Sequence, residues 1–419
     1  MSRPVADHTL PPRVLIVGLG IAGLATAIRL SRLGWQVTIV ERASERRRSG
    51  YFVALFKSGV NTAERLGMRH LIHNRVAQTG QAWDITRDGQ RSPGLGYGRL
   101  SGGTSPHRSG DLILRSDLED AGFRALPQDV EIRYATIPVA ISQDADGVDV
   151  TLRELTGHKE STERFDLLVG ADGVHSSVRQ LAFGLQEEQV LQPTGYMIAS
   201  FMLDQAVPGF KLQDSLILSE KGRSAWVFSF EDHAPAVLFS YKCSNLAEEK
   251  KSDPALSLRR AWGPGNYGQT LDWLLQKFEQ AETYVFDSAD QVHMESWHHG
   301  RVVLVGDSAW CLTLYSGMGA SCALAGAETL GTFLARAHND IYRGLAQWEK
   351  YMRPYIEQQM KSGRAMRSFF TVENELEAQA RSLRTKLYSS KLVGRYGRKV
   401  SSVLLKSKLE DIGAGADLL

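Results

Sequence analysis

The sequence predicts an α/β protein in which a doubly wound parallel sheet, assembled from separated stretches of the chain, is interrupted by a β-rich domain and followed by helices. Residues 14–17 form a short aliphatic run that ends at Gly18, and helical apolar spacing follows over residues 21–33. A second strand is expected at residues 36–41. Two nearby strands joined by a helix are typical of the right-handed unit that opens a parallel sheet.

Later segments predict where this first domain is interrupted. Residues 131–155 alternate as in an antiparallel meander, residues 165–169 return to a buried strand, and residues 302–305 form another. Strand-like runs fill residues 194–245, and the chain beyond about residue 319 is mainly helical. We therefore expect a first domain from 1–75, 100–185 and 290–335, a β-rich domain from 76–99 and 186–289, and a C-terminal helical region from 336–419.

Size and composition exclude several classes of protein. The chain has 419 residues, which is more than one core usually holds, and 43% hydrophobic with 23% charged residues is typical of a globular protein. A net charge of +2 gives no field that would attract nucleic acid. The three cysteines show no metal-ligand spacing, so we expect no metal. With no signal peptide or integral membrane segment in the pattern, we expect a cytoplasmic protein.

The strongest local motif is a GxGxxG fingerprint between the first strand and the first helix. Gly18 permits the tight turn, Gly20 lets the backbone approach a pyrophosphate, and Gly23 lets helix and strand pack closely. Free N–H groups near Ile21 and Ala22 would donate to the phosphates. Such a turn can also arise for packing alone, but its position between strand and helix favours a dinucleotide site.

An acidic residue indicates which dinucleotide the site binds. Glu41 ends the second strand, where a carboxylate hydrogen-bonds a ribose and disfavours a 2′-phosphate. The pattern therefore predicts FAD or NAD rather than NADP as the bound dinucleotide.

Two further motifs identify the family. Residues 166–179 (DLLVGADGVHSSVR) look like the DG motif, and residues 301–309 (RVVLVGDSA) look like the GD motif, of class A flavoprotein monooxygenases of the para-hydroxybenzoate hydroxylase type. With the glycine fingerprint they follow in the family's order. The resemblance implies a Rossmann-like, discontinuous FAD-binding domain and a β-rich substrate domain.

The resemblance also implies roles for individual residues. Asp307 would bind the ribityl hydroxyls of FAD, and Arg115 would face its pyrophosphate with two parallel hydrogen bonds. Asp172 would lie near the adenine half, or it is a turn-forming residue without ligand contact. Arg42 and Arg48 complete the expected cofactor contacts, although an arginine-rich run is usually surface.

A glycine loop after the GD motif is expected at the flavin ring. Gly317, Met318, Gly319 and Ala320 would present N–H groups and a helix N-terminus to the N1 and C2 carbonyl region of reduced flavin. The family's usual His and Pro are replaced here by Trp310 and Leu314, which leaves the loop shape and the mobility of the flavin open.

The loop, together with residues 348–355, resembles more narrowly the branch that includes tetracycline-inactivating monooxygenases, which suggests an aromatic or polycyclic substrate. Aromatic and neighbouring residues on the expected strands could form the substrate wall, or could equally be plain core. They are Tyr196, Met197, Trp226, Phe228 and Tyr315. We expect no catalytic side chain, because the flavin carries the chemistry.

The implied reaction begins when NADPH or NADH, docking transiently, reduces FAD. O2 then gives a flavin C4a-hydroperoxide, which hydroxylates the small-molecule substrate or effects a Baeyer–Villiger oxidation. Two alternatives stay open: a flavoprotein without net redox turnover (a cyclase, isomerase or binding protein), and an isoprenoid-lipid reductase that uses a basic helix near residues 400–404. Substrate identity, nicotinamide preference and oligomeric state do not follow from these patterns.

Overall fold

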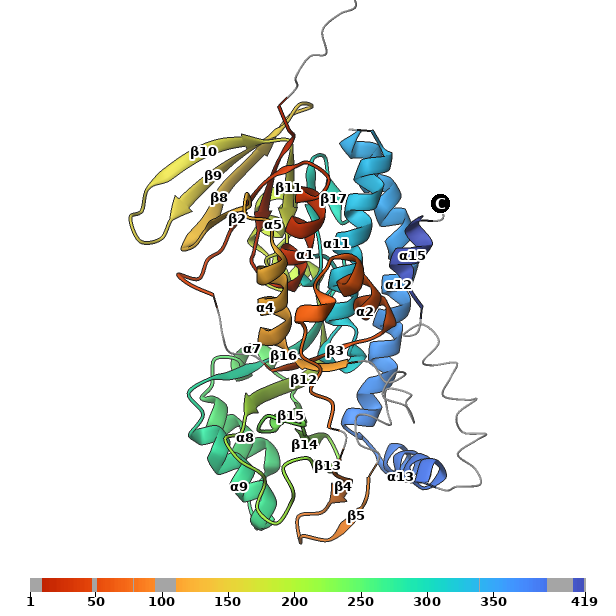
Figure 1. Cartoon of the computed structure of the whole chain (residues 1–419). Helices are drawn as coiled ribbons and strands as arrows, with labels where there is room; N and C mark the ends of the chain where they lie inside the picture. Colours follow the sequence, from red (N-terminus) through yellow and green to blue (C-terminus); the bar gives the residue numbers. More distant parts are fainter. Residues whose placement is uncertain are drawn as a thin grey trace, which may run out of the picture.

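The computed structural model describes residues 10–46, 51–77, 79–94, 111–338, 340–389 and 410–417. Its first layer is a six-stranded sheet that holds the N-terminal strand near its centre (Figure 1). The order across this sheet is β17 (His298–His299), β18 (Val302–Leu304), β11 (Leu167–Gly170), β1 (Arg13–Val17), β2 (Gln36–Val40) and β7 (Glu131–Arg133). The chain thus leaves the sheet and returns to it, as the sequence predicted.

Pairing in this sheet is parallel from β7 to β18, and β17 alone of its strands runs antiparallel at the edge. Val14, Leu15 and Ile16 are fully buried, because helices cover a parallel sheet. The covering helices include α1 (Ile21–Ser31), α4 (Arg115–Ala125) and α11 (Gly319–Arg336).

The interpretation of Glu131–Arg133 was wrong. Assigned to the antiparallel meander, this segment instead forms β7 and pairs parallel with β2, with Glu131 opposite Thr38. A strand of three residues is too short to display an alternation. It ends at Arg133, and Ala135, whose φ is +46°, turns the chain into the next strand.

The true meander is a separate three-stranded antiparallel sheet, made of β8 (Thr136–Gln143), β9 (Val148–Glu154) and β10 (Glu160–Phe165). Val148, Val150 and Leu152 alternate along β9 and join the core of the first sheet. Two short helices, α5 (Ser177–Phe183) and α6 (Glu187–Val190), lead onward to the second large sheet.

That second sheet has seven strands. Its order is β16 (Tyr284–Val292), β12 (Leu191–Met202), β15 (Ala236–Lys242), β14 (Arg223–Phe228), β13 (Ser215–Glu220), β4 (Ala82–Ile85) and β5 (Arg91–Pro93). One face packs on α8 (Pro254–Trp262) and α9 (Gly268–Glu279), with α7 (Leu246–Glu249) beside them (Figure 1). The opposite face looks toward the first sheet.

The remaining elements join the two sheets. They are the ribbon β3 (Phe52–Leu55) and β6 (Asp111–Leu114), the helices α2 (Lys57–Arg65), η1 (Arg69–Leu71), α10 (Asp307–Trp310), η2 (Leu314–Ser316), α12 (Ile341–Phe370), α13 (Glu375–Ser389) and α15 (Ile412–Asp417). The long α12 packs on α11 and continues down to the second sheet (Figure 1). The basic stretch near residue 400 lies outside the described residues. Among the helices that are described, none has the length and apolar character needed to cross a bilayer.

Candidate functional site

A cavity of about 310 Å³ lies where the two large sheets meet. Its walls come from the β1–α1 turn, the ribbon strand β3, the start of α4, the turns after β11 and β18, and the inner face of β12 and β16. The end of α12 closes it with Met366 and Phe370. Segments far apart in the sequence therefore share one hollow, at the carboxyl ends of parallel strands where α/β sheets bind ligands.

The three fingerprint glycines have different surroundings. A Cβ added to Gly18 would lie 2.5 Å from the Ala171 carbonyl oxygen, and one added to Gly23 would lie 1.9 Å from the Gly18 carbonyl oxygen. Gly18 also has a φ of +106°. A Cβ on Gly20 would meet nothing nearer than 3.9 Å, where Arg115 Nη2 lies. Two glycines are therefore needed by the backbone packing, whereas Gly20 borders open cavity.

The first turn of α1 is suited to an anion. The helix begins after Gly20 without a side-chain cap and without an acidic residue in its first turn. Ile21 and Ala22 line the cavity, so their backbone N–H groups and the positive end of the helix dipole face it. A pyrophosphate would satisfy donors that this chain leaves uncapped.

Glu41 holds the glycine turn in place. Its Oε2 accepts a hydrogen bond of 2.9 Å from the Leu19 N–H, and its Oε1 accepts one of 2.8 Å from the Ala43 N–H. Each carboxylate oxygen keeps a further lone pair, so the proposed ribose contact remains compatible with this role. Arg42 is exposed at the same turn, while Arg48 lies outside the described residues.

Arg115 opens α4 and lines the cavity beside Gly20. Its Nε donates to Glu119 Oε1 at 2.9 Å, and its guanidinium lies 5.8 Å from the centre of the Tyr51 ring. Burial raises the pKa of Tyr51, so the phenol stays protonated against the arginine. Tyr51 also lines the cavity, and the sequence pattern gave no signal for it.

Asp307 begins α10 directly after β18, and its side chain is exposed to the cavity. The turn before it depends on Gly306, whose φ is +77° and whose added Cβ would lie 2.9 Å from the Ala22 Cβ. This close approach sets the carboxyl against the glycine turn. Desolvation by the surrounding protein raises the pKa of the Asp307 carboxyl, and the positive charge of Arg115 opposes that rise.

The carboxylate of Asp172 accepts hydrogen bonds from the residues at the start of α5. Its Oδ1 accepts from Ser176 Oγ at 2.5 Å, and its Oδ2 accepts from Ser177 Oγ at 3.0 Å and from the Val178 N–H at 3.1 Å. The carboxylate thus holds the start of α5, which fits the turn-forming alternative. A direct cofactor contact of Asp172 stays a prediction.

Arg179, at the end of the DG motif, was given no role by the sequence. Its side chain is 1% exposed, and it donates 2.9 Å and 2.6 Å hydrogen bonds to the carbonyls of Ser308 and Val174. Ser308 Oγ in turn donates to the Gly170 carbonyl at 2.7 Å. These bonds fasten the DG and GD turns to each other, and only the fold reveals that the two motifs meet.

The glycine loop after α10 lines the cavity with Gly317, Gly319 and Ala320. Gly317 has a φ of +64°, and α11 begins two residues later with no side-chain cap and no acidic residue in its first turn. Met318 differs from its neighbours, because its side chain is fully buried and its N–H donates to Ser316 Oγ at 3.0 Å.

The two departures from the family pattern have separate consequences. Trp310 is buried in the core, with its ring 4.6 Å from Trp297 and 5.8 Å from Trp348. Leu314 instead lines the cavity. The tryptophan therefore serves packing behind the loop, and the leucine adds apolar surface to the site.

Gln291, on β16, anchors this loop from behind. Its Nε2 donates to the carbonyls of Leu312 at 3.3 Å and Met360 at 3.2 Å, and its Oε1 accepts from Arg364 Nε at 2.7 Å. The side chain is 1% exposed. One amide thus ties the cavity loop and α12 to the second sheet, a role that no local pattern in the sequence could indicate.

The five residues proposed for the substrate wall do not all lie on the same face of the second sheet. Tyr315 lines the cavity, Phe228 lines a neighbouring one, and Tyr196 and Trp226 are buried beside Tyr315 and Phe370. Met197 packs in the core on the other face of the sheet. Successive strand residues alternate between faces, so Ile198 and Ser200, rather than Met197, are the residues of β12 that line the cavity.

Comparison with known proteins agrees with this geometry. The model of the family described as "FAD binding domain" matches residues 12–358. The chain belongs to this family. It is an FAD-dependent monooxygenase of the class A flavoprotein type, which confirms the resemblance drawn from the three motifs.

Three similar proteins cover most of the monooxygenase. A flavin-dependent monooxygenase from an unknown prokaryotic organism is 25% identical over 381 residues, which is 88% of this chain and 94% of that protein. The crystal structure of tetracycline destructase Tet(55) is 24% identical, with a TM-score of 0.74 over 94% of this chain and 98% of that one. Klebsiella pneumoniae HpxO complexed with FAD and uric acid is 18% identical, with a TM-score of 0.71 over 96% of each chain. These likenesses confirm the α/β fold.

Proposed function

We propose that the monooxygenase uses NADPH or NADH to reduce FAD and inserts one oxygen atom of O2 into an aromatic or polycyclic small molecule. The observation that carries this proposal is the single cavity in which the nucleotide-binding turns face the inner surface of the second sheet. A cofactor held by the turns would therefore have its reactive end against that sheet.

The residues present fit FAD. Uncapped N–H groups of α1 and the guanidinium of Arg115 suit the pyrophosphate, Glu41 suits the ribose, and the carboxyl of Asp307 suits the ribityl hydroxyls. Gly20 leaves the space into which a pyrophosphate must come. Bound FAD supplies the electron transfer and the activation of O2.

The protein's own part is positioning and electrostatics. The uncapped N-terminus of α11 would present positive potential to the ring of bound FAD. Apolar residues that include Ile198, Leu238 and Phe370 surround the same space and exclude water from it. We assign no catalytic side chain, because bound FAD would carry the oxygen chemistry.

The substrate class is supported by the lining and by the similar proteins. Aliphatic side chains of the second sheet, such as Ile198 and Leu238, and the aromatic ring of Phe370 form part of the cavity wall, and such walls favour ring-containing ligands. The solved structures with this fold include a tetracycline destructase and an HpxO complex with uric acid. The sequence carries one dinucleotide fingerprint, so we infer that the nicotinamide donor docks transiently.

The proposal is tested on the purified, FAD-loaded protein. Aromatic and polycyclic compounds are screened for stimulation of NAD(P)H consumption, and products are analysed by mass spectrometry for one added oxygen atom. We expect at least one compound both to accelerate NAD(P)H oxidation and to gain oxygen. Conversion of a compound to a rearranged product without NAD(P)H or O2 would instead support a flavoprotein without net redox turnover.

A further inference from the structure

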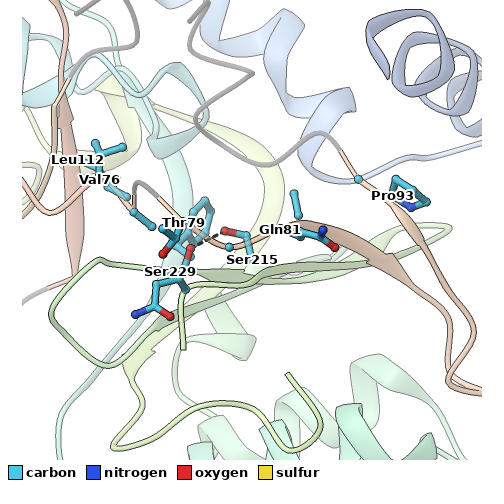
Figure 2. A pocket seen from close by; sticks show the side chains of 13 residues that line it. Val76, Thr79, Gln81, Pro93, Leu112, Ser215 and Ser229 are labelled. Carbon is cyan, nitrogen blue, oxygen red and sulfur yellow. Dashed lines mark hydrogen bonds between the residues drawn. The ribbon is translucent and has the colours of Figure 1, made fainter. Parts of the chain in front are cut away.

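A second cavity, of about 410 Å³, lies at the edge of the seven-stranded sheet. It extends from Val76 and Leu112 at one end to Pro93 at the other, with Thr79, Ser215 and Ser229 between them (Figure 2). Nothing in the proposed FAD contacts uses this space. Its volume falls within the usual range of small-molecule sites.

Two side chains in contact, one from each cavity, separate the second cavity from the FAD cavity. Phe228 lines the second cavity, and its ring centre lies 4.0 Å from that of Phe52, which lines the FAD cavity. Leu112 also lines the second cavity and pairs across the ribbon with Ala54, which lines the first. At this point a molecule in the second cavity would therefore be separated from the FAD site by the rings of Phe228 and Phe52.

The wall around residue 80 is held in a fixed position. A Cβ on Gly80 would lie 2.2 Å from the Gln213 carbonyl oxygen, and Gly80 has a φ of +101°. The Gln81 N–H donates to Asp214 Oδ1 at 2.8 Å, and the Ser215 N–H donates to the Gln81 carbonyl at 2.9 Å. Backbone contacts thus fix this part of the cavity wall.

The lining residues that the structure describes carry no charge. Hydroxyls of Thr79, Ser215 and Ser229 and amides of Gln81 and Gln213 provide its polar groups. Ser215 Oγ and Ser229 Oγ lie 2.8 Å apart, so one hydroxyl donates to the other and the second keeps its hydrogen for a ligand (Figure 2). The Phe228 ring and aliphatic side chains supply the apolar surface.

We propose that this cavity binds the incoming substrate of the monooxygenase, a neutral ring-containing molecule with hydroxyl or carbonyl groups, with Phe52 and Phe228 as the partition from the flavin. Among the described lining residues an anion would lose its hydration without gaining a countercharge, so neutral molecules are preferred. A ring would stack on Phe228 while its polar groups bond the serine pair. This inference rests on the proposed function and names the substrate class that it would accept.

The test uses 2-naphthol as a neutral probe and 2-naphthoate as its anionic counterpart, with FAD-loaded protein. Equilibrium titration and a crystal soaked with 2-naphthol should find the neutral probe against Phe228 and the serine pair. We expect Thr79→Trp, an exposed substitution at the rim, to weaken 2-naphthol binding at least tenfold. Ser215→Leu should do the same, and the matched control Thr162→Trp, on exposed β10, should not.

Four results would overturn the inference. Naphthoate binds as tightly as naphthol, naphthol occupies the FAD cavity alone, naphthol shows no saturable binding, or Thr79→Trp and Ser215→Leu both bind naphthol with wild-type affinity. The outcome is separable from that of the proposed function. If naphthol occupies the second cavity but no compound is ever oxygenated, the function alone is contradicted. If oxygenation proceeds at wild-type KM in Thr79→Trp and Ser215→Leu, the function stands and the second cavity is not its substrate site.

Discussion

The fingerprint glycines offer a prediction in which folding and cofactor binding separate. Gly20→Ala places a Cβ where nothing lies nearer than 3.9 Å, at a φ of −82° that alanine adopts freely. The cofactor-free protein should lose no more than about 1 kcal/mol, the usual difference between glycine and alanine before a helix. The Cβ would, however, enter the space of the pyrophosphate. Loss of one charge-assisted hydrogen bond costs about 1.5–3 kcal/mol, or about 10- to 150-fold in the Kd for FAD.

Gly23→Ala is the opposite case. Its Cβ would lie 1.9 Å from the Gly18 carbonyl oxygen, so helix and strand must move apart even without cofactor. The cost should reach about 3 kcal/mol or more, at the upper end of what overpacking causes. Urea unfolding of both cofactor-free variants, with FAD titration by fluorescence quenching, measures the two effects. Wild-type FAD affinity in Gly20→Ala, or equal destabilisation of the two variants, would refute the assignment of Gly20 to the ligand.

Three further outcomes follow from single contacts. Asp307→Asn should weaken FAD binding by about 10-fold or more, because it loses a charge-assisted hydrogen bond to the cofactor. The cofactor-free variant should be as stable as the wild type or slightly more stable, because the raised pKa of Asp307 means that folding disfavours the ionised carboxylate. A destabilised cofactor-free variant would contradict this reasoning. Hydrogen bonding to Asp287 and Glu187 raises the pKa of His175, so the stability that His175→Gln removes should be fully present below the unfolded pKa of about 6.5 and should decline as pH rises through the folded pKa. A difference in urea titrations that grows toward about pH 9 would exclude the ion pair. Gln291→Met removes the side-chain donor that reaches the Leu312 and Met360 carbonyls and the acceptor of Arg364 Nε, so it should destabilise by about 1–3 kcal/mol and increase the share of NAD(P)H lost to peroxide. The exposed control Gln276→Met should change neither, and unchanged coupling would make Gln291 a structural residue only.

The sequence was most informative where function constrains the backbone. The GxGxxG turn, the DG motif and the GD motif each impose glycines or short carboxylates at turns, so their order predicted the family and the parallel sheet. The same local reasoning could not place Arg179, because its bonds to the Ser308 carbonyl depend on two motifs 129 residues apart meeting in space.

Other residues were misjudged for identifiable physical reasons. Glu131–Arg133 is too short to reveal its pairing, which only the position of β2 decides. Met197 was grouped with Tyr196, although neighbours on a strand must face opposite sides. For Trp310 the sequence left the effect open, because its packing against Trp297 and Trp348 depends on the fold.

The proposed function depends most on the convergence of the three turns on one FAD molecule. Its most direct measurement is the amount of FAD retained after the purified chain is loaded and passed through gel filtration. We predict a yellow protein with one FAD per chain, and a clear loss of bound flavin in Gly20→Ala and in Asp307→Asn while both stay folded. A colourless wild-type protein, or full retention of flavin in both folded variants, would contradict it.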